Sequence, residues 1–386
     1  MFDTVMRIEC FMEEGLSRLF QGCTCLEDLN LERLPALPTV PAAIGALARL
    51  THLHLAAHVH RLPGAFTCLR ALHTCVLHLP GLKQLPPGFG SLTCLLSLHL
   101  DACQSLTSLP ELFGELANLD RLSISRCSRF FLPGSFPALA SLKELKVKRC
   151  EALSPLPGDF GQLQVLESLV LEEVGRITGL PESVGQLQRL HSLSIDDCHD
   201  LSSLPTSLPH LSSLTHLHLN APDLLLLPDG IGRPYASEHS AWPASMCLLS
   251  SLTHLTMSEC PALATLPHAM GLGLHSLREL TLKCKNLTHL PPSFFRLTAL
   301  EQLSIVHLAR VKGPLPCCFS CFTCLRELSL VAMSHLTALL ALLAALAPTL
   351  TSLHVACCSE LKVVAEELSQ LTMLHTLTLT CLDNLK

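Results

Sequence analysis

The chain has 386 residues, of which 49% are hydrophobic, and a formal net charge of −6. That negative charge argues against binding to nucleic acid. The sequence contains no run of about 18 apolar residues, so it predicts no membrane-spanning helix. Leucine dominates while Tyr and Trp occur once each. Because mixed globular domains rarely have so uniform a composition, internal repeats are expected.

The first 24 residues precede any repetition. Acidic residues begin at Asp3 and no basic segment leads into an apolar run, so no secretory signal is predicted. We expect residues 1–24 to form a short helical cap, because the ends of a stacked array must be covered. Its inward side chains would be Phe11, Leu16, Leu19 and Phe20. A soluble, cytoplasmic protein without membrane insertion follows.

One phrase, L-x-x-L-x-L-x-x-C-x-x-L-x-x-L-P, recurs over residues 25–386. Most steps between copies are 23 to 26 residues long, and one step, of 38 residues, contains an insertion near 229–246. Fifteen copies are predicted to start at Leu26, Leu50, Leu69, Leu95, Leu119, Leu142, Leu166, Leu190, Leu214, Leu252, Leu277, Leu300, Leu325, Leu350 and Leu374.

The spacing within the phrase predicts local structure. L-x-L has a period of two, so its leucines point to one face of a short strand and the x residues to the other. Such strands are stable only when stacked, which gives one parallel sheet with strands about 4.8 Å apart. Leu-Pro ends the strand side, because proline lacks an N–H and fixes φ. The stretch that follows, such as 182–187, is expected to form a helical turn.

These features resemble leucine-rich repeats of the plant type found in intracellular nucleotide-binding disease-resistance receptors. The continuation L-P-x-x-I/F-G-x-L is matched at Leu180-Pro-Glu-Ser-Val-Gly185-Gln-Leu187 and Leu109-Pro-Glu-Leu-Phe-Gly114-Glu-Leu116. The resemblance implies an α/β solenoid, a horseshoe or arc with a concave parallel sheet and a convex side of short helices and irregular segments.

The implied function is recognition of a protein partner on the concave face, in intracellular immune-type sensing or signalling. Adaptors for small GTPases share the L-P-x-x-I-G-x-L segment, so a stand-alone adaptor is the alternative. The phosphate loop G-x-x-x-x-G-K-[ST] does not occur in the 386 residues, so no nucleotide cofactor or ATPase activity is carried over.

Cysteines occupy two repeat positions. One set falls where many leucine-rich repeats carry Asn, and a second precedes the strand in the phrase T-C-L. Both are expected to be reduced packing residues, with thiols of the first set meeting backbone carbonyls. The first set is Cys103, Cys127, Cys150, Cys198, Cys260 and Cys358, with Cys284 one residue early, and the second is Cys25, Cys68, Cys94 and Cys324.

Charge concentrates in the middle repeats, where a basic zone is predicted to lie beside an acidic one. Two interpretations are open. Either Lys148 pairs with Glu172 and Arg149 with Glu173, each pair contributing about 0–1 kcal/mol, or the zones form a bipolar docking patch for a partner. Candidate protein-binding residues are Arg121, Arg126, Lys146, Lys148, Arg149, Glu172, Glu173, Asp196 and Asp197, with Arg129 and Lys143 nearby.

The insertion near 229–246 holds the only tyrosine, Tyr235, and the only tryptophan, Trp242. Aromatic side chains on a protruding loop are good interface anchors, which makes both candidate protein-binding residues. The alternative is a tolerated surface insertion whose tryptophan folds back on the solenoid.

Two clusters raise the rival hypothesis of a metal-dependent or redox enzyme. His216, His218 and His254 are expected on neighbouring strands, as His52 and His54 are on one strand, but no carboxylate is expected beside them to orient a ligand. Cys318, Cys321 and Cys324, with Cys317 directly before them, form a C-x-x-C-x-x-C pattern in which Cys324 is expected to be buried. The favoured interpretation of the histidines is a repeat unit, S-L-T-H-L-H-L, copied by recombination, and that of the cysteines is packing. Neither an enzyme nor a bound metal or cofactor is therefore predicted.

The sequence ends partway through a repeat, at 382–386. An uncovered apolar edge favours association, so two interpretations are open. Either the chain is part of a longer or shortened product, with further domains missing in cis, or the frayed last repeat covers itself.

Overall fold

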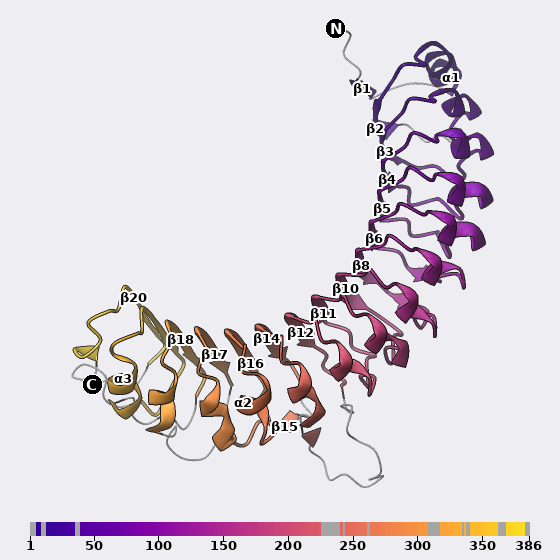
Figure 1. The fold of residues 1–386 in the computed structure, drawn as a ribbon. Coiled ribbons are helices and arrows are strands. Elements are labelled where there is room, and N and C mark those ends of the chain that lie inside the picture. Colours follow the sequence, from indigo (N-terminus) through magenta and orange to yellow (C-terminus); the bar gives the residue numbers. More distant parts are fainter. Residues whose placement is uncertain are drawn as a thin grey trace. The chain divides into compact units, whose positions relative to one another are not determined.

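The structure is a computed structural model that describes residues 5–8, 13–34, 39–224, 240–241, 244–260, 263–307, 317–333, 336, 340–361 and 368–382. The chain divides into two compact units, Met1–Leu190 and His191–Lys386, called unit 1 and unit 2. Each is described by itself. In both, short parallel strands follow one another in chain order along one face, the strand face, and short helices line the other, the helix face (Figure 1).

The main sheet of unit 1, in the part of the chain that the structure describes, contains β1 (Val5–Ile8), β2 (Asp28–Leu34), β3 (His52–Ala57), β4 (Thr74–His78), β5 (Ser97–Asp101), β6 (Arg121–Ser125), β8 (Glu144–Cys150) and β10 (Ser168–Val174). A two-stranded sheet joins β7 (Arg129–Phe130) to β9 (Ala152–Leu153). The helix face carries the 3-10 helices η1 (Ala42–Ala46), η2 (Gly64–Cys68), η3 (Pro87–Ser91), η4 (Glu111–Glu115), η5 (Phe136–Ala138), η6 (Phe160–Gln162) and η7 (Glu182–Gln186).

The described residues of unit 2 form the main strands β11 (Ser192–Asp196), β12 (His216–Asn220), β14 (His254–Ser258), β16 (Glu279–Lys283), β17 (Gln302–Val306), β18 (Glu327–Val331), β19 (Ser352–Ala356) and β20 (Thr376–Thr380). The minor strands β13 (Ser240–Ala241) and β15 (Leu263–Thr265) pair with each other. Its helices are η8 (Leu208–His210), η9 (Ala244–Leu248), α2 (Met270–Gly273), η10 (Pro292–Arg296), η11 (Cys317–Cys321) and α3 (Leu340–Leu346).

The predicted solenoid is confirmed, and the strand pattern explains its core. In β6, Leu122 and Ile124 are buried while the flanking side chains are exposed or half-buried. The register then sets each inward residue against its equivalent, as in Leu122 with Leu145 on β8. Because every repeat adds such a pair, a continuous apolar layer forms under the sheet.

The Leu-Pro segment starts the helix face as predicted. Pro110 has φ −61° and ψ 152°, and its carbonyl accepts a hydrogen bond from the Phe113 N–H at 3.0 Å. The glycine of the motif has a steric role: a Cβ on Gly114 would lie 2.1 Å from the Ser135 oxygen of the next coil. Only glycine lets successive coils approach so closely.

Aromatic rings fill the helix side of the unit 1 core. Five consecutive repeats each place one fully buried phenylalanine here, and the rings stack with centroids 6.0 to 6.4 Å apart and planes within 15°. This phenylalanine ladder consists of Phe66, Phe89, Phe113, Phe136 and Phe160. It fixes the spacing of the coils that carry the strand face.

Two features of the chain's first half differ from the predictions. Helix α1 (Glu13–Gly22) buries Leu16 and Phe20 and is preceded by β1, a strand that the sequence did not predict and that pairs with β2. Phe11 lies outside the described residues, so the capping role stays a prediction. The third repeat begins at Leu72 rather than at Leu69, because Cys75 takes the inward strand position and pairs with Leu98.

Among the residues that the structure describes, no helix is long and apolar enough to cross a bilayer.

Candidate functional site

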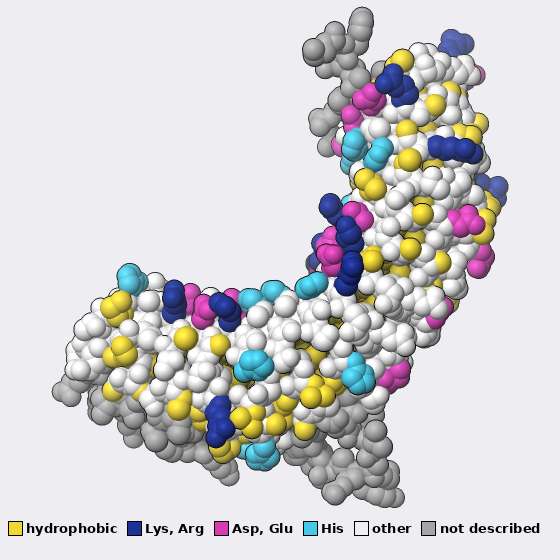
Figure 2. All heavy atoms as spheres, in the orientation of Figure 1, with side chains coloured by type: hydrophobic (Ala, Val, Ile, Leu, Met, Phe, Trp, Pro, Cys, Tyr) yellow, Lys and Arg dark blue, Asp and Glu magenta, His cyan; other side chains and the backbone are white. Residues whose placement is uncertain are grey.

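The strand face of unit 1 carries a charged ridge, defined by residues at and just beyond the ends of successive strands. Figure 2 shows Lys and Arg side chains gathered with Asp and Glu side chains over β6 and β8. The ridge consists of Asp101, Arg126, Lys148, Arg149, Glu172 and Glu173.

Each cation of the ridge meets an acid on the adjacent coil. Lys148 Nζ lies 2.5 Å from Glu172 Oε2, and Arg149 Nε donates to Glu173 Oε1 at 3.2 Å. The register explains the first contact, because Lys148 and Glu172 are paired across β8 and β10. These are the two pairings expected from the sequence. Both are partly exposed, so each contributes about 0–1 kcal/mol.

Asp101 anchors the start of the ridge. Arg126 Nε donates to its Oδ1 at 2.9 Å, Ser125 Oγ donates at 2.6 Å, and His78 Nδ1 lies 3.1 Å from its Oδ2. Burial raises the pKa of Asp101, but the hydrogen bonds from Arg126, Ser125 and His78 outweigh it and lower the pKa to about 2. The Asp101 carboxylate of the folded protein is therefore ionised near neutral pH.

The other two basic candidates of unit 1 are paired as well. Lys146 contacts Glu144 on its own strand, and Arg121 Nε lies 3.8 Å from Asp120. The five basic candidate residues, Arg121, Arg126, Lys146, Lys148 and Arg149, thus each lie close to an acidic side chain. In unit 2, Asp196 accepts a hydrogen bond from Asn220 at 2.8 Å, and Asp197 lies 3.1 Å from His199.

Left-handed backbone conformation fixes where the ridge side chains leave the strand. Arg126, Arg149 and Glu173 have φ between 50° and 55°. The N–H of Arg126 is thereby directed to the Lys148 carbonyl, at 2.9 Å. Other repeats have the same turn, as at Ala332, so it belongs to the fold.

The cysteine after this turn is buried in each repeat of the first set, as predicted. Cys127 Sγ donates to the Ser125 carbonyl at 3.6 Å, and Cys150 Sγ donates to the Lys148 carbonyl at 3.4 Å. Burial raises the pKa of Cys103 to about 11, which keeps that thiol protonated and unreactive.

The packing prediction for the T-C-L cysteines is wrong. Cys25, Cys94 and Cys324 are exposed, because each occupies a tight turn between the helix face and the strand. Cys68 is also exposed and ends η2, four residues before the true repeat start at Leu72. The expected burial of Cys324 fails with the rest of the set.

The prediction that no carboxylate lies beside the histidines is also wrong. His254 Nε2 is 3.2 Å from Glu279, which the register places directly opposite it, and His218 Nε2 is 3.4 Å from Asp196. The His216 and His254 rings stack with centroids 4.1 Å apart. Burial lowers the pKa of His216, the charge of His254 lowers it further, and Glu279 opposes both.

In unit 1, His52 lies 3.1 Å from Asp28 and His54 lies 3.5 Å from Glu32. Within the described part of the chain, no group of three or more His, Cys, Asp or Glu side chains is arranged to hold a metal ion.

Several candidates fall outside what the structure describes. Tyr235 and Trp242 lie in the omitted segments of the insertion, and the side chains of Cys317 and Cys318 are also outside the described set. Of that cysteine pattern, Cys321 is exposed, as is Cys324.

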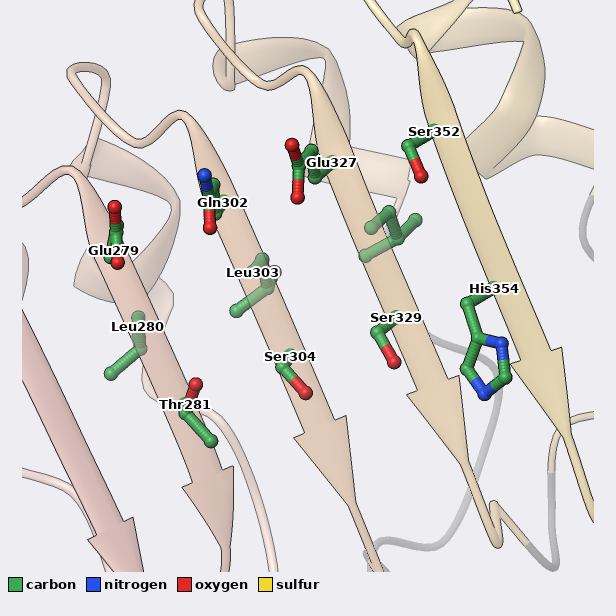
Figure 3. A pocket seen from close by; sticks show the side chains of 11 residues that line it. Glu279, Leu280, Thr281, Gln302, Leu303, Ser304, Glu327, Ser329, Ser352 and His354 are labelled. Carbon is green, nitrogen blue, oxygen red and sulfur yellow. The ribbon is translucent and has the colours of Figure 1, made fainter. Parts of the chain in front are cut away.

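A feature that the sequence analysis missed lies on the strand face of unit 2. A hollow of about 180 Å³ crosses β16, β17, β18 and β19 (Figure 3). Its lining residues, which define the hydroxyl hollow, are Glu279, Leu280, Thr281, Gln302, Leu303, Ser304, Glu327, Leu328, Ser329, Ser352 and His354. The sequence pattern that could have indicated this hollow is a run of small hydroxyl residues at the middle x position of consecutive L-x-L strands.

Comparison with known proteins identifies the fold. No protein-family profile matches the chain, and no curated protein sequence matches it. A solved leucine-rich-repeat protein of Leptospira interrogans is 26% identical, with a TM-score of 0.77 over 94% of this chain and 86% of that one.

Two further solved structures share the fold at lower identity. The Toll chain of the Drosophila Toll–Spatzle complex is 19% identical, with a TM-score of 0.72 over 97% of this chain and 51% of that one. An internalin of Listeria monocytogenes is 16% identical, with a TM-score of 0.51 over 92% and 81%. The chain thus has the leucine-rich-repeat fold, which is typically a non-enzymatic scaffold for protein–protein interaction.

Proposed function

We propose that this chain recognises a protein partner with its strand face, inside the cell, in immune-type sensing or signalling. The observation that carries the proposal is the strand face itself. Outward side chains of the L-x-L strands stand in fixed rows on a layer of fully buried leucines. Such a surface is organised before binding, so little conformational entropy is lost when a partner docks.

Two further features support the cellular setting. The described cysteines are free thiols, and those of the first set are buried against carbonyls, which suits a reducing compartment. The immune-type role rests on the resemblance of the repeat phrase, L-P-x-x-I/F-G-x-L, to the plant-type repeats of disease-resistance receptors.

Site-specific photo-cross-linking tests the binding face. A benzoylphenylalanine at Ser123, which is half-buried on β6, reports on the strand face, and the same residue at Leu112, which is 50% exposed on η4, reports on the helix face. We expect protein cross-links from position 123 and none from position 112 in extracts of the source cells. Cross-links from position 112 alone would move the interface to the helix face, and none from either would end the binding proposal.

The charged ridge is proposed as a docking element in the same interface, and a charge swap separates docking from structural pairing. Lys148→Glu with Glu172→Lys keeps an ion pair in place but reverses its polarity, and Arg149→Glu with Glu173→Arg does the same for the second pair. We expect the swapped protein to fold normally and bind its cross-linked partner about tenfold more weakly. Unchanged affinity would leave the ridge a purely structural feature.

The insertion is a second proposed contact, through Tyr235 and Trp242. Replacing both with alanine should weaken partner binding about tenfold or more if they anchor the interface. The signalling role has its own readout: the cross-linked partners should change when source cells are exposed to a microbial extract. A constant set of partners would remove immune-type sensing and leave a scaffold.

A further inference from the structure

The hydroxyl hollow has an ordered floor and a charged rim. The register aligns Thr281, Ser304, Ser329 and His354 in one row across β16 to β19. Figure 3 shows Glu279, Gln302 and Glu327 forming a second row alongside it, one from each strand. Three of the four side chains in this row, Thr281, Ser304 and Ser329, are small, which leaves the sheet surface hollow here.

The hollow is acidic. Among the residues that the structure describes, the ionisable ones in the lining are Glu279, Glu327 and His354, and none of the lining residues is a lysine or arginine. Nearby cations lie outside it: Arg278 is bound to Glu301 at 2.8 Å, Arg326 precedes β18 and Lys283 ends β16. A ligand in the hollow therefore meets carboxylates and hydroxyls first.

The hydrogen-bonding capacity of the lining is also unused. Within the described residues, the side chains of Gln302, Glu327, Ser304, Ser329 and His354 make no hydrogen bond or ion pair, in contrast to Arg126, Lys148 and Arg149 of the charged ridge. Glu279 has one partner, His254, at 3.2 Å. A surface with this many open acceptors and donors in fixed rows is complementary to an extended peptide backbone.

We propose that the hydroxyl hollow binds an extended peptide segment across β16 to β19, with a lysine or arginine side chain over Gln302, between Glu279 and Glu327. Adjacent strands are about 4.8 Å apart. A cation over Gln302 on β17 therefore lies about 5 Å from the positions of Glu279 on β16 and Glu327 on β18. The four strands span about 14 Å, which takes about five extended residues.

The side of the hollow nearer the ends of the strands determines which alternate side chains of the peptide fit. Successive side chains of an extended chain point to opposite sides, so those next to the basic residue face the ends of the strands. There the hollow is bordered by Val306 and Val331, both half-buried. The favoured ligand therefore alternates basic and apolar residues. This inference deepens the proposed function and rests on it.

Fluorescence polarisation with labelled synthetic peptides tests the inference on the whole chain. The probe is acetyl-SRVRVS-amide, and its acidic counterpart is acetyl-SEVEVS-amide. We expect saturable binding of the arginine peptide only. Glu279→Gln with Glu327→Gln should weaken it about threefold to tenfold, the value of two exposed ion pairs.

Two further variants make the result specific. Glu111→Gln with Glu115→Gln removes the same charge from the exposed helix face of unit 1 and should leave binding unchanged. Ser304→Leu fills the hollow without changing charge and should abolish binding, with a normal melting temperature as its folding control.

Equal binding of the two peptides, or an unchanged affinity in the Glu279 and Glu327 double variant, overturns the inference. The titration needs no natural partner, so its outcome is independent of the cross-linking test. If a partner cross-links from position 123 and still binds the Glu279 and Glu327 double variant, the hollow is not its binding site, and the proposed function of the strand face stands. Peptide binding without any protein cross-link removes the function as proposed.

Discussion

The charged ridge of unit 1 and the hydroxyl hollow of unit 2 differ in how their charged side chains are paired. In unit 1 the acidic and basic side chains of the ridge satisfy one another, as Lys148 and Glu172 do at 2.5 Å. In the hydroxyl hollow of unit 2, Glu327 has no such partner within the described residues, and the neighbouring floor is made of small hydroxyl side chains. The same repeat therefore produces one surface whose charges are paired and another whose polar groups are open to a ligand.

The aromatic packing on the helix faces also differs between the two units. Unit 1 has its regular phenylalanine ladder, whereas unit 2 gathers Phe294, Phe295, Phe319 and Phe322 in a cluster of mostly edge-to-face contacts. Regular repeats place one ring per coil in register, and irregular repeats do not. The units thus differ in core packing as well as in surface, which makes the comparison testable on both.

Removing a core ring should have the largest effect. Phe113 is fully buried between Phe89 and Phe136, so Phe113→Ala is expected to cost about 3–5 kcal/mol of unfolding free energy. Hydrogen exchange should show protection lost first in unit 1. Phe319→Ala, also fully buried, should cost a similar amount and act first in unit 2. If either variant lowers protection evenly in both units, they unfold together and cannot be treated separately.

Paired and unpaired carboxylates should respond differently to neutralisation. Asp101→Asn is expected to cost about 1 kcal/mol, because it breaks hydrogen bonds to a charged group, whereas Glu327→Gln should lie within about 0.5 kcal/mol of the parent. The folded pKa of Asp101, about 2, is below its ordinary value of 3.8. Its contribution is therefore present above about pH 4 and lost as the pH falls toward 2.

Denaturant unfolding at several pH values checks this difference. The parent should lose stability between about pH 4 and pH 2, and Asp101→Asn should lose less over the same interval. Equal slopes for the two proteins would show that the ridge does not hold the carboxylate charged. A large cost for Glu327→Gln would show that the hollow has a structural partner for that residue.

The sequence predicted the repeat architecture because buried positions repeat with one chemistry. Leucine at the inward strand positions has a packing reason in every coil, and the single register error, at Leu69, arose where Cys75 replaced that leucine. The pairing of Lys148 with Glu172 was predictable for the same reason, since equivalent positions become neighbours.

The site was less predictable because outward positions carry no packing constraint. Ser304 and Ser329 are unremarkable as residues, and only their alignment across strands makes a hollow. Glu279 was missed beside His254 although the register aligns them. The T-C-L cysteines show the converse error: a position that repeats, such as Cys94, is not thereby buried.

The stacked histidines of unit 2 offer a smaller effect with a defined sign. Burial and the charge of His254 lower the pKa of His216, and Glu279 raises it. His254→Gln should therefore raise the pKa of His216 in an NMR titration, and Glu279→Gln should lower it. Because the folded pKa lies below 6.5, stability is present above that pH and declines as the pH falls through the folded value. Shifts of the same sign in both variants would contradict this account.

The smallest effect comes from the left-handed turn, where the units differ by one ion pair. Ala332, at φ 54°, has no charged side chain, so Ala332→Gly should relieve backbone strain and stabilise the protein by about 0.5–1 kcal/mol. Arg149 has φ 52°, but Arg149→Gly also removes its contact with Glu173 at 3.2 Å. The gain should then shrink to near zero, as measured by denaturant unfolding. If Arg149→Gly stabilises the protein as much as Ala332→Gly does, the exposed pair between Arg149 and Glu173 adds nothing to stability.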